Sequence, residues 1–398
     1  MPRPSAPMPR QLFFSTPEQR LALARERFFE RGERPSGLVN DAVLQSWSRC
    51  LALGRRPHEE PNAESVSRTR LHSALRLSRQ LREASTGGLQ QLEAAIAGTP
   101  CRVILTNPEG VVVYISPRGA QPHETTMLRL GGVGTDLSEA NMGTSAPGIV
   151  AKTGHGCSVQ GGEHFSEAVG RVHCAAAPIR DVHGQLAGVL DLTVEGHGFG
   201  FDAFALVGSY ASTIENHLLQ LQSDDLLVLA FQADPSLLGT PLEALAGVCS
   251  DGRLRWVNTT AIRLARASAG QPVADALGHE LGTLLGLLRQ SRPQPLRLSS
   301  GLTVWMQARL RSGDGAGPLL PAPVPQAALV TEPPALTAEA PATLDMQRAH
   351  QIAHTLQACG GNVARAARQL GVSRGLIYRN MKPAPAPCVP NGNTSGPG

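Results

Sequence analysis

The chain has 398 residues, of which 36 are Lys or Arg and 32 are Asp or Glu, giving a net charge of +4, and 41% are hydrophobic. This length predicts several domains of ordinary size, each able to bury its own core. There is no run of eighteen apolar residues, no apolar signal segment at the N-terminus and no glycine followed by lysine, which argues against a membrane-spanning helix, secretion and a P-loop ATPase.

The first 97 residues are predicted to form a helical segment. Thr16 is a suitable N-cap for the helix that follows it, and a second helix is expected over 38–54, ending at Gly54. Leucines near a helical period predict a third helix over about 62–97, which stops at Gly98.

The pattern then changes to strands. Two apolar runs between 101 and 116 flank an Asn-Pro-Glu-Gly turn and predict a β-hairpin, and the same pattern returns at 173–193. A glycine-rich connection between them holds one predicted helix near 140–153. Together these elements predict a small α+β sensor domain over 98–222 with an antiparallel sheet.

A helix is predicted from Asp202 to about Leu229. Its apolar residues alternate spacings of three and four, as in the seam of a coiled coil. These are Phe204, Val207, Ala211, Ile214, Leu218 and Leu221. Two interpretations remain open and compatible: the seam pairs two copies of the chain, or it packs the helix onto its own sheet.

A second, smaller α+β domain of PAS-like type is predicted over 223–310. It combines a hairpin signal at 245–258, a helical stretch over 259–291 and a strand at 302–310. Residues 311–343 contain seven prolines and are expected to form a linker, and the tail over 383–398 is expected to be disordered.

The segment 344–382 is basic. It carries six Lys or Arg against the single acid Asp345, a net charge of +5, so the rest of the chain sums to about −1. Gly360-Gly361 ends a first predicted helix, and Asn362 and Ser373 are suitable N-caps for two more. Short helices joined by a glycine-containing turn form a helix-turn-helix, and its positive charge is typical of a module that binds DNA.

This geometry assigns roles to individual residues. The N-terminal residues of the last helix would read base edges in the major groove, and other basic residues would contact phosphates. The base-reading candidates are Ser373, Arg374, Gly375, Leu376 and Tyr378; the phosphate candidates are Arg365, Arg368, Arg379 and Lys382. Arg374 can form a bidentate contact to guanine.

The sequence GGNVARAARQLGVSRGLIYRNMK resembles the helix-turn-helix of the factor-for-inversion-stimulation (Fis) type at the C-terminus of bacterial enhancer-binding activators. It departs from the family pattern at Gly375 and Leu376, where the family favours Ser or Asn and Thr. The resemblance implies sequence-specific DNA binding, and the departures imply a different sequence preference.

A second resemblance covers about 38–220. The motifs Leu44-Gln-Ser-Trp-Ser-Arg-Cys50, Glu139-Ala-Asn-Met-Gly-Thr-Ser145, Gly162-Glu-His-Phe165, Cys174-Ala-Ala-Ala-Pro-Ile179 and Gly188-Val-Leu-Asp-Leu192 are similar, in order and spacing, to the acetoin catabolism regulator group. The resemblance implies a GAF sensor domain. That family usually carries an AAA+ ATPase between sensor and helix-turn-helix. Here a PAS-like segment and a linker occupy that place, so remodelling of a sigma-54 polymerase by this chain is not expected.

A small α+β domain can form a ligand pocket between its sheet and the covering loops. The candidates to line it are His155, Glu163, His164 and Cys174. Each also has a structural interpretation, since Glu163 can cap a turn and His164 can be a hydrogen-bonded core histidine. Irregular Cys and His spacing argues against a metal site. A thiol enzyme using Cys157 or Cys174 remains an alternative that needs a lowered thiol pKa.

The sequence therefore predicts a multidomain α+β protein with a GAF-like sensor, a PAS-like domain and a small all-α helix-turn-helix. We expect a cytoplasmic, non-enzymatic transcription regulator without cofactors, since seven scattered cysteines fit a reducing compartment. Its expected partners are double-stranded DNA, a small-molecule effector, a second copy in a homodimer, and RNA polymerase or a partner activator, with no membrane. A ligand-binding protein whose C-terminal helices only oligomerise is the other alternative.

Overall fold

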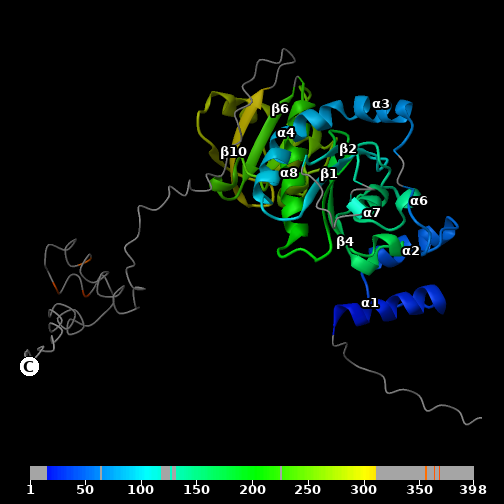
Figure 1. Cartoon of the computed structure of the whole chain (residues 1–398). Coiled ribbons are helices and arrows are strands. Elements are labelled where there is room, and N and C mark those ends of the chain that lie inside the picture. The colour runs from blue at the N-terminus through cyan, green and yellow to red at the C-terminus, as the bar shows by residue number, and fades with distance from the viewer. Residues whose placement is uncertain are drawn as a thin grey trace, which may run out of the picture. The chain divides into compact units, whose positions relative to one another are not determined.

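The computed structural model describes residues 16–62, 65–117, 126–127, 131–224 and 226–310, together with Thr355, Val363 and Ala367 (Figure 1). The chain divides into two compact units, Met1–Pro323 and Val324–Gly398, and the elements below belong to the first. The predicted linker, the C-terminal tail and all of the predicted helix-turn-helix except Thr355, Val363 and Ala367 lie outside the described residues. In the described part of the chain, no helix is long and apolar enough to cross a membrane.

The N-terminal helices are α1 (Pro17–Arg25), which continues as the π-helical turn η1 (Glu26–Glu30), α2 (Asp41–Ala52), α3 (Arg68–Leu77) and α4 (Arg79–Ala95). The predicted cap is confirmed, because the Thr16 side chain accepts a hydrogen bond from the amide of Gln19. The single helix expected over 62–97 is wrong. Its place is taken by α3 and α4, which meet at the buried Ser78.

The first sheet contains β1 (Arg102–Thr106), β2 (Val112–Ile115), β3 (Cys157–Gln160), β4 (Val172–Arg180) and β5 (Leu186–Glu195). Its strand order is β2-β1-β5-β4-β3, and every neighbouring pair is antiparallel. Both predicted hairpins, β1–β2 and β4–β5, are confirmed. The predicted central helix is divided into α6 (Glu139–Met142) and α7 (Ala146–Thr153), and two 3-10 turns follow, η2 (Gly161–Glu163) and η3 (Glu167–Val169).

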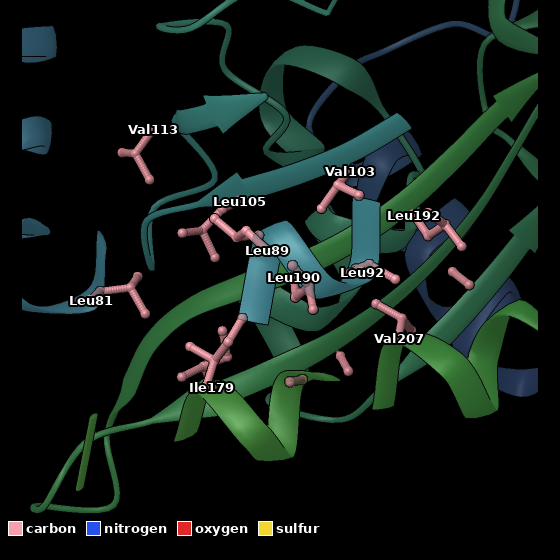
Figure 2. Packing of buried hydrophobic residues seen from close by; sticks show 14 of the residues in the cluster. Leu81, Leu89, Leu92, Val103, Leu105, Val113, Ile179, Leu190, Leu192 and Val207 are labelled. Atoms are coloured by element: carbon pink, nitrogen blue, oxygen red, sulfur yellow. The ribbon is translucent and has the colours of Figure 1, made fainter. Parts of the chain in front are cut away.

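Helices cover both faces of the first sheet. On one face Leu190 and Leu192 of β5 pack among leucines of α4 and Val207 of α8 (Ala203–Leu221), as Figure 2 shows. On the other face α2, α6 and α7 form a second buried cluster with β1, β3, β4 and β5, which includes the fully buried Trp47 and Phe165. The sheet is therefore buried on both sides, and polar residues on its strands are withdrawn from water.

Helix α8 lies on its own sheet. Val207, Ala211, Ile214 and Leu218 of the predicted seam are buried in the cluster they share with α4 and the first sheet, whereas Phe204 is 46% exposed. The packing interpretation is therefore correct for these four residues. The helix ends at Leu221 and not near Leu229.

The second sheet contains β6 (Leu227–Gln232), β7 (Ala244–Val248), β8 (Leu254–Val257), β9 (Gln294–Arg297) and β10 (Thr303–Leu310). Its order is β8-β7-β6-β10-β9. The β7–β8 hairpin and β10 confirm the predicted strands. The helical stretch over 259–291 is divided into α9 (Thr259–Ala265), α10 (Val273–Leu277), α11 (Leu281–Gly286) and a 3-10 turn, η5 (Leu287–Arg289). The α+β prediction is thus confirmed as two antiparallel sheets with helices.

The last turns of α8 also pack against the second sheet. Trp256 Nε1 of β8 donates a 2.9 Å hydrogen bond to Ser223 Oγ, just after the helix, and Asn258 Nδ2 donates one of 2.9 Å to Asn216 Oδ1. Leu219 packs with Trp256 in a cluster formed with β6 and β7. One helix therefore contributes to two hydrophobic cores.

Candidate functional site

The middle strand of the first sheet carries a row of buried polar residues. Asp191, Thr193 and Glu195 of β5 are only 0%, 2% and 4% exposed. Because alternate residues of a strand point to the same face, all three lie on the face covered by α2, α6 and α7, while Leu190 and Leu192 lie on the other. A polar row in a doubly covered central strand needs partners.

Hydrogen bonds connect part of this row to β4 and η2. The Thr193 hydroxyl donates to Asp191 Oδ2, and Thr193 Oγ1 lies 3.3 Å from Cys174 Sγ. His164 Nδ1 lies 2.9 Å from the carbonyl oxygen of Gly161, so this nitrogen carries the proton and donates. His164 Nε2 is then left as an acceptor, 3.7 Å from Cys174 Sγ. We call Asp191, Thr193, Cys174 and His164 the polar cluster.

Two buried side-chain oxygen atoms on this face are unsatisfied. Asp191 Oδ1 and Thr106 Oγ1, both buried, have no hydrogen-bond partner among the residues that the structure describes. Thr106 is on β1, opposite Val189 and so one pair along the same face from Asp191, which is opposite Ile104. Leaving such a buried group unpaired costs about 1–3 kcal/mol. Asp191 Oδ1 and Thr106 Oγ1 are therefore candidates for hydrogen bonds to a bound molecule.

Burial sets the protonation of the polar cluster. It raises the pKa of Asp191 to about 7 and lowers the pKa of His164 to about 4. Burial also raises the pKa of the Cys174 thiol well above its ordinary value, and the nearby Asp191 adds to this. Near neutral pH, His164 is therefore an uncharged imidazole and Cys174 a protonated thiol.

This protonation argues against the thiol enzyme. A nucleophilic cysteine needs an accessible sulfur and a lowered pKa, whereas Cys174 is buried and its pKa is raised. The other candidate, Cys157, is also buried, and burial raises its pKa to about 12. Neither cysteine has the environment of a reactive thiolate.

An ion pair joins α2 to the helix that covers the polar row. Arg49 Nε donates to Glu139 Oε2 over 2.7 Å and Arg49 Nη2 to Glu139 Oε1 over 2.6 Å, a two-pronged contact. Ser46 Oγ donates to the same carboxylate over 2.6 Å and lies 2.8 Å from Thr144 Oγ1. These residues come from two of the sequence motifs, 44–50 and 139–145. The two motifs therefore hold α2 and α6 together over this face of the sheet.

A second set of contacts joins α1 and α2 to η2. Trp47 Nε1 donates a 2.8 Å hydrogen bond to the carbonyl of Glu163. Arg25 Nη1 donates to the carbonyls of Gly162 and His164 over 3.0 and 2.8 Å, and its guanidinium lies 4.9 Å from the ring centroid of Phe29. The N-terminal helices therefore fix the backbone on both sides of Glu163.

The far end of the polar row has its own partners. Glu195 accepts hydrogen bonds from the amides of Thr126 and Met127, at 3.2 and 2.9 Å. The Met127 side chain is buried in the same cluster as the cover. Glu195 is satisfied in this way, in contrast to Asp191.

The structure brings together only two of the predicted pocket residues, His164 and Cys174. Glu163 Oε2 accepts a 2.9 Å hydrogen bond from the amide of Gln160, and burial raises the Glu163 pKa; its side chain caps a turn, as the structural interpretation expected. His155 is exposed after α7, and its Nδ1 lies 2.8 Å from the carbonyl oxygen of Thr153.

Sequence reasoning missed Asp191, Thr193 and Thr106 as site residues. A signal was present, because Asp191, Thr193 and Glu195 alternate with Leu and Val in a run otherwise fit for a buried strand. No group of three or more His, Cys, Asp or Glu residues that could hold a metal ion occurs in the described ranges.

The predicted DNA-contacting residues lie outside the described residues. These are Ser373, Arg374, Gly375, Leu376, Tyr378, Arg365, Arg368, Arg379 and Lys382. Their roles therefore remain predictions from the sequence.

Two family models match the chain. Residues 16–216 match the model described as "MimR, N-terminal domain", which covers half of the chain. Residues 349–382 match "Bacterial regulatory protein, Fis family", so the C-terminal segment is a helix-turn-helix of the expected type.

The chain is similar to known regulators. It is 30% identical over 279 residues to the acetoin catabolism regulatory protein of Cupriavidus necator, covering 66% of this chain and 41% of that protein. It is 25% identical over 173 residues to the acetoin dehydrogenase operon transcriptional activator AcoR of Bacillus subtilis, covering 44% and 28%. The chain thus spans less than half the length of these relatives.

Among solved structures, the DhaR(N)–DhaL complex of E. coli contains a chain that is 17% identical, with a TM-score of 0.41. The superposition covers 68% of this chain and 99% of that one.

Proposed function

The chain belongs to the MimR N-terminal domain family, and on that premise we propose that it is a transcriptional regulator that binds DNA and senses a small molecule. DNA binding is assigned to a helix-turn-helix at 344–382 and sensing to a GAF-like domain at 98–222, preceded by the helical segment 1–97. A PAS-like domain at 223–310 and a linker at 311–343 connect the two. The observation that carries the proposal is the Fis-family match of a segment with a net charge of +5.

The chemistry of DNA binding follows from the geometry of such modules. Ser373, Arg374, Gly375, Leu376 and Tyr378 begin the helix that enters the major groove, where Arg374 reads a guanine. Arg365, Arg368, Arg379 and Lys382 contact phosphates, which fix position without reading sequence. A single module of this size reads few bases, so we expect a homodimer on a pseudo-palindromic site.

The sensing role is supported by the first sheet. Its five antiparallel strands carry helices on both faces, and the face under α2, α6 and α7 combines an apolar cluster with unsatisfied polar atoms. Ligand sites of this kind are mostly apolar, with a few fixed polar groups.

The mode of action is not enzymatic. The two lysines, Lys152 and Lys382, follow Ala151 and Met381, so the chain has no Gly-Lys pair with which to cradle nucleotide phosphates. We therefore expect the protein to act without hydrolysing ATP through a P-loop and without remodelling a sigma-54 polymerase itself. Recruitment of RNA polymerase, occupancy of a promoter, or contact with a partner activator would each suffice.

Gel-shift titration of the full chain at several salt concentrations tests DNA binding. Neutralisation of Z phosphates gives a slope of log K against log salt of about −0.9Z, whereas a protein that only oligomerises shows none. Arg374→Ala should weaken specific binding by about 1–3 kcal/mol and relax the preference at one base pair. Arg79→Ala, at an exposed position of α4, is the matched control. Absence of any salt-dependent DNA affinity would refute the proposal.

A further inference from the structure

We propose that the first domain binds a small uncharged molecule bearing a hydroxyl group, which hydrogen-bonds to Asp191 Oδ1 on the covered face of the sheet, with Thr106 as a second polar contact. This inference rests on the proposed sensing function and specifies the chemistry of its ligand. On the covered face, two buried side-chain oxygen atoms have no partner among the described residues, Asp191 Oδ1 and Thr106 Oγ1.

The positions of these atoms suit a single small molecule. In the β1–β5 register, Ile104 is opposite Asp191 and Thr106 is opposite Val189. Asp191 and Thr106 are therefore diagonal neighbours on one face, roughly 7–8 Å apart at the backbone. Ile104, Val189 and Val112 belong to the apolar cluster on the same face. A ligand here would meet these two polar groups beside the apolar side chains of the same face.

The state of Asp191 selects a hydroxyl. Oδ2 already accepts the Thr193 hydroxyl, which leaves Oδ1 to be satisfied. A deprotonated Oδ1 needs a donor, and a protonated one needs an acceptor. A hydroxyl group is both, so it satisfies Asp191 in either protonation state.

The surroundings disfavour a charged ligand. The polar cluster offers no cation to pair with an anionic ligand, because His164 is neutral and Cys174 is a protonated thiol near neutral pH. The burial that raises the pKa of its one acid, Asp191, to about 7 also opposes the entry of a cation, which would have to give up its water. Besides Asp191, the acidic and basic residues that the β1–β5 register places on this face are Glu195, bonded to backbone amides, and Arg102, which already has an interaction partner. Burying an ion without a free partner costs far more than burying a hydroxyl.

Binding of simple probes to the full chain tests the chemistry. Isobutanol and phenol are titrated by isothermal calorimetry, each beside the fluoro compound in which fluorine replaces the hydroxyl. We expect at least one alcohol to bind and its fluoro counterpart to bind roughly tenfold more weakly or worse, the loss produced by one unmade hydrogen bond. Isobutyrate and isobutylammonium supply the anionic and cationic arms and should bind more weakly than isobutanol.

Two variants test the proposed contacts of the ligand with Asp191 and Thr106. Asp191→Val removes the carboxyl with a side chain of similar size, and the Thr193 hydroxyl keeps Cys174 Sγ, 3.3 Å away, as an acceptor. Alcohol affinity should fall by roughly tenfold or more, while the Tm without probe stays equal or rises, because an unsatisfied buried group has been removed. A purely structural Asp191 would lower the Tm. Thr106→Val should show the same pattern with a smaller loss of affinity.

The matched control is Glu215→Gln. Glu215 is also a buried acid of this domain, but its Oε2 accepts a 2.9 Å hydrogen bond from the amide of Arg180. This variant should leave alcohol affinity unchanged.

Four results would overturn the inference: no alcohol bound by the wild type, equal affinity in Asp191→Val, a lowered Tm in Asp191→Val, or tighter binding of an ionic probe than of isobutanol. Gel shifts on the same preparations keep the two proposals apart. Salt-dependent DNA binding without alcohol binding refutes only this inference, and alcohol binding without DNA binding refutes only the regulator.

Discussion

The raised pKa of Asp191 predicts a specific dependence of stability on pH. Burial raises that pKa from 3.8 to about 7, so the folded protein holds the proton more tightly than the unfolded chain does. The stability that this group contributes is therefore fully present below about pH 4 and is lost as the pH rises through about 7. Asp191→Asn removes the titration while preserving the shape and the acceptor for Thr193.

The size of the effect follows from the shift. About three pKa units at 1.36 kcal/mol each amount to about 4 kcal/mol between pH 4 and pH 7. Over this window the variant should gain up to that much stability relative to the wild type. Glu215, whose pKa is raised to about 7, and His164, whose pKa is lowered to about 4, titrate in both proteins. Their contributions cancel in the difference.

Urea unfolding of both proteins across this pH range measures the difference in the free energy of unfolding. That difference should grow in favour of Asp191→Asn as the pH rises from about 4 to about 7. A flat difference would mean that Asp191 has the same pKa in the folded and unfolded chains. A difference that shrinks would mean that the folded protein stabilises the carboxylate.

Three further outcomes follow from contacts described above. Gly247→Ala should lower the thermal unfolding midpoint, because a Cβ there would lie 2.3 Å from Trp256 Nε1 and overpacking costs about 1–3 kcal/mol. Tryptophan fluorescence measures this midpoint, and an unchanged value would contradict the close contact between Gly247 and Trp256. Arg49→Ala should lower the free energy of unfolding by about 3–5 kcal/mol, because it leaves the buried Glu139 carboxylate without its cation. Chemical denaturation measures this loss, and a value near zero would show that the ion pair is not formed. Native Cys174 should resist iodoacetamide at neutral pH and react only after unfolding, as mass spectrometry can measure; rapid native labelling would revive the thiol enzyme.

The elements that the sequence predicts well are those whose signals are local. The hairpin at 101–116 is indicated by an Asn-Pro-Glu-Gly turn between two apolar runs. The helix cap at Thr16 is also a local signal, since its hydrogen-bond partner, the amide of Gln19, is three residues away. The sequence pattern extends the preceding helix to about Leu229, into strand β6, because a short apolar run has no period that separates a helix from a strand. Strand β9, four residues long and containing a proline, carries still less signal.

The candidate site depends on contacts that are distant in sequence. Arg49 and Glu139 lie 90 residues apart, and no local pattern joins them. The motifs containing them resembled a known family, but their role in holding the cover emerges only from the fold. Asp191 was visible within one of those motifs, yet its meaning depends on helices covering both faces of β5, which no strand pattern reveals.

Helix α8 packs against both sheets, and this limits where the chain can be divided into fragments for experiments. A cut at residue 222, where the sequence suggests a joint between two domains, would take the indole partner Ser223 away from the fragment that keeps the helix. It would also leave Leu219 open to solvent on that fragment and Trp256 stripped of its cover on the other. Expression of either half alone therefore exposes apolar side chains that are buried in the whole chain. Aggregation of such a fragment would result from this lost contact between α8 and the second sheet, and would not show that the fragment's own sheet is unstable.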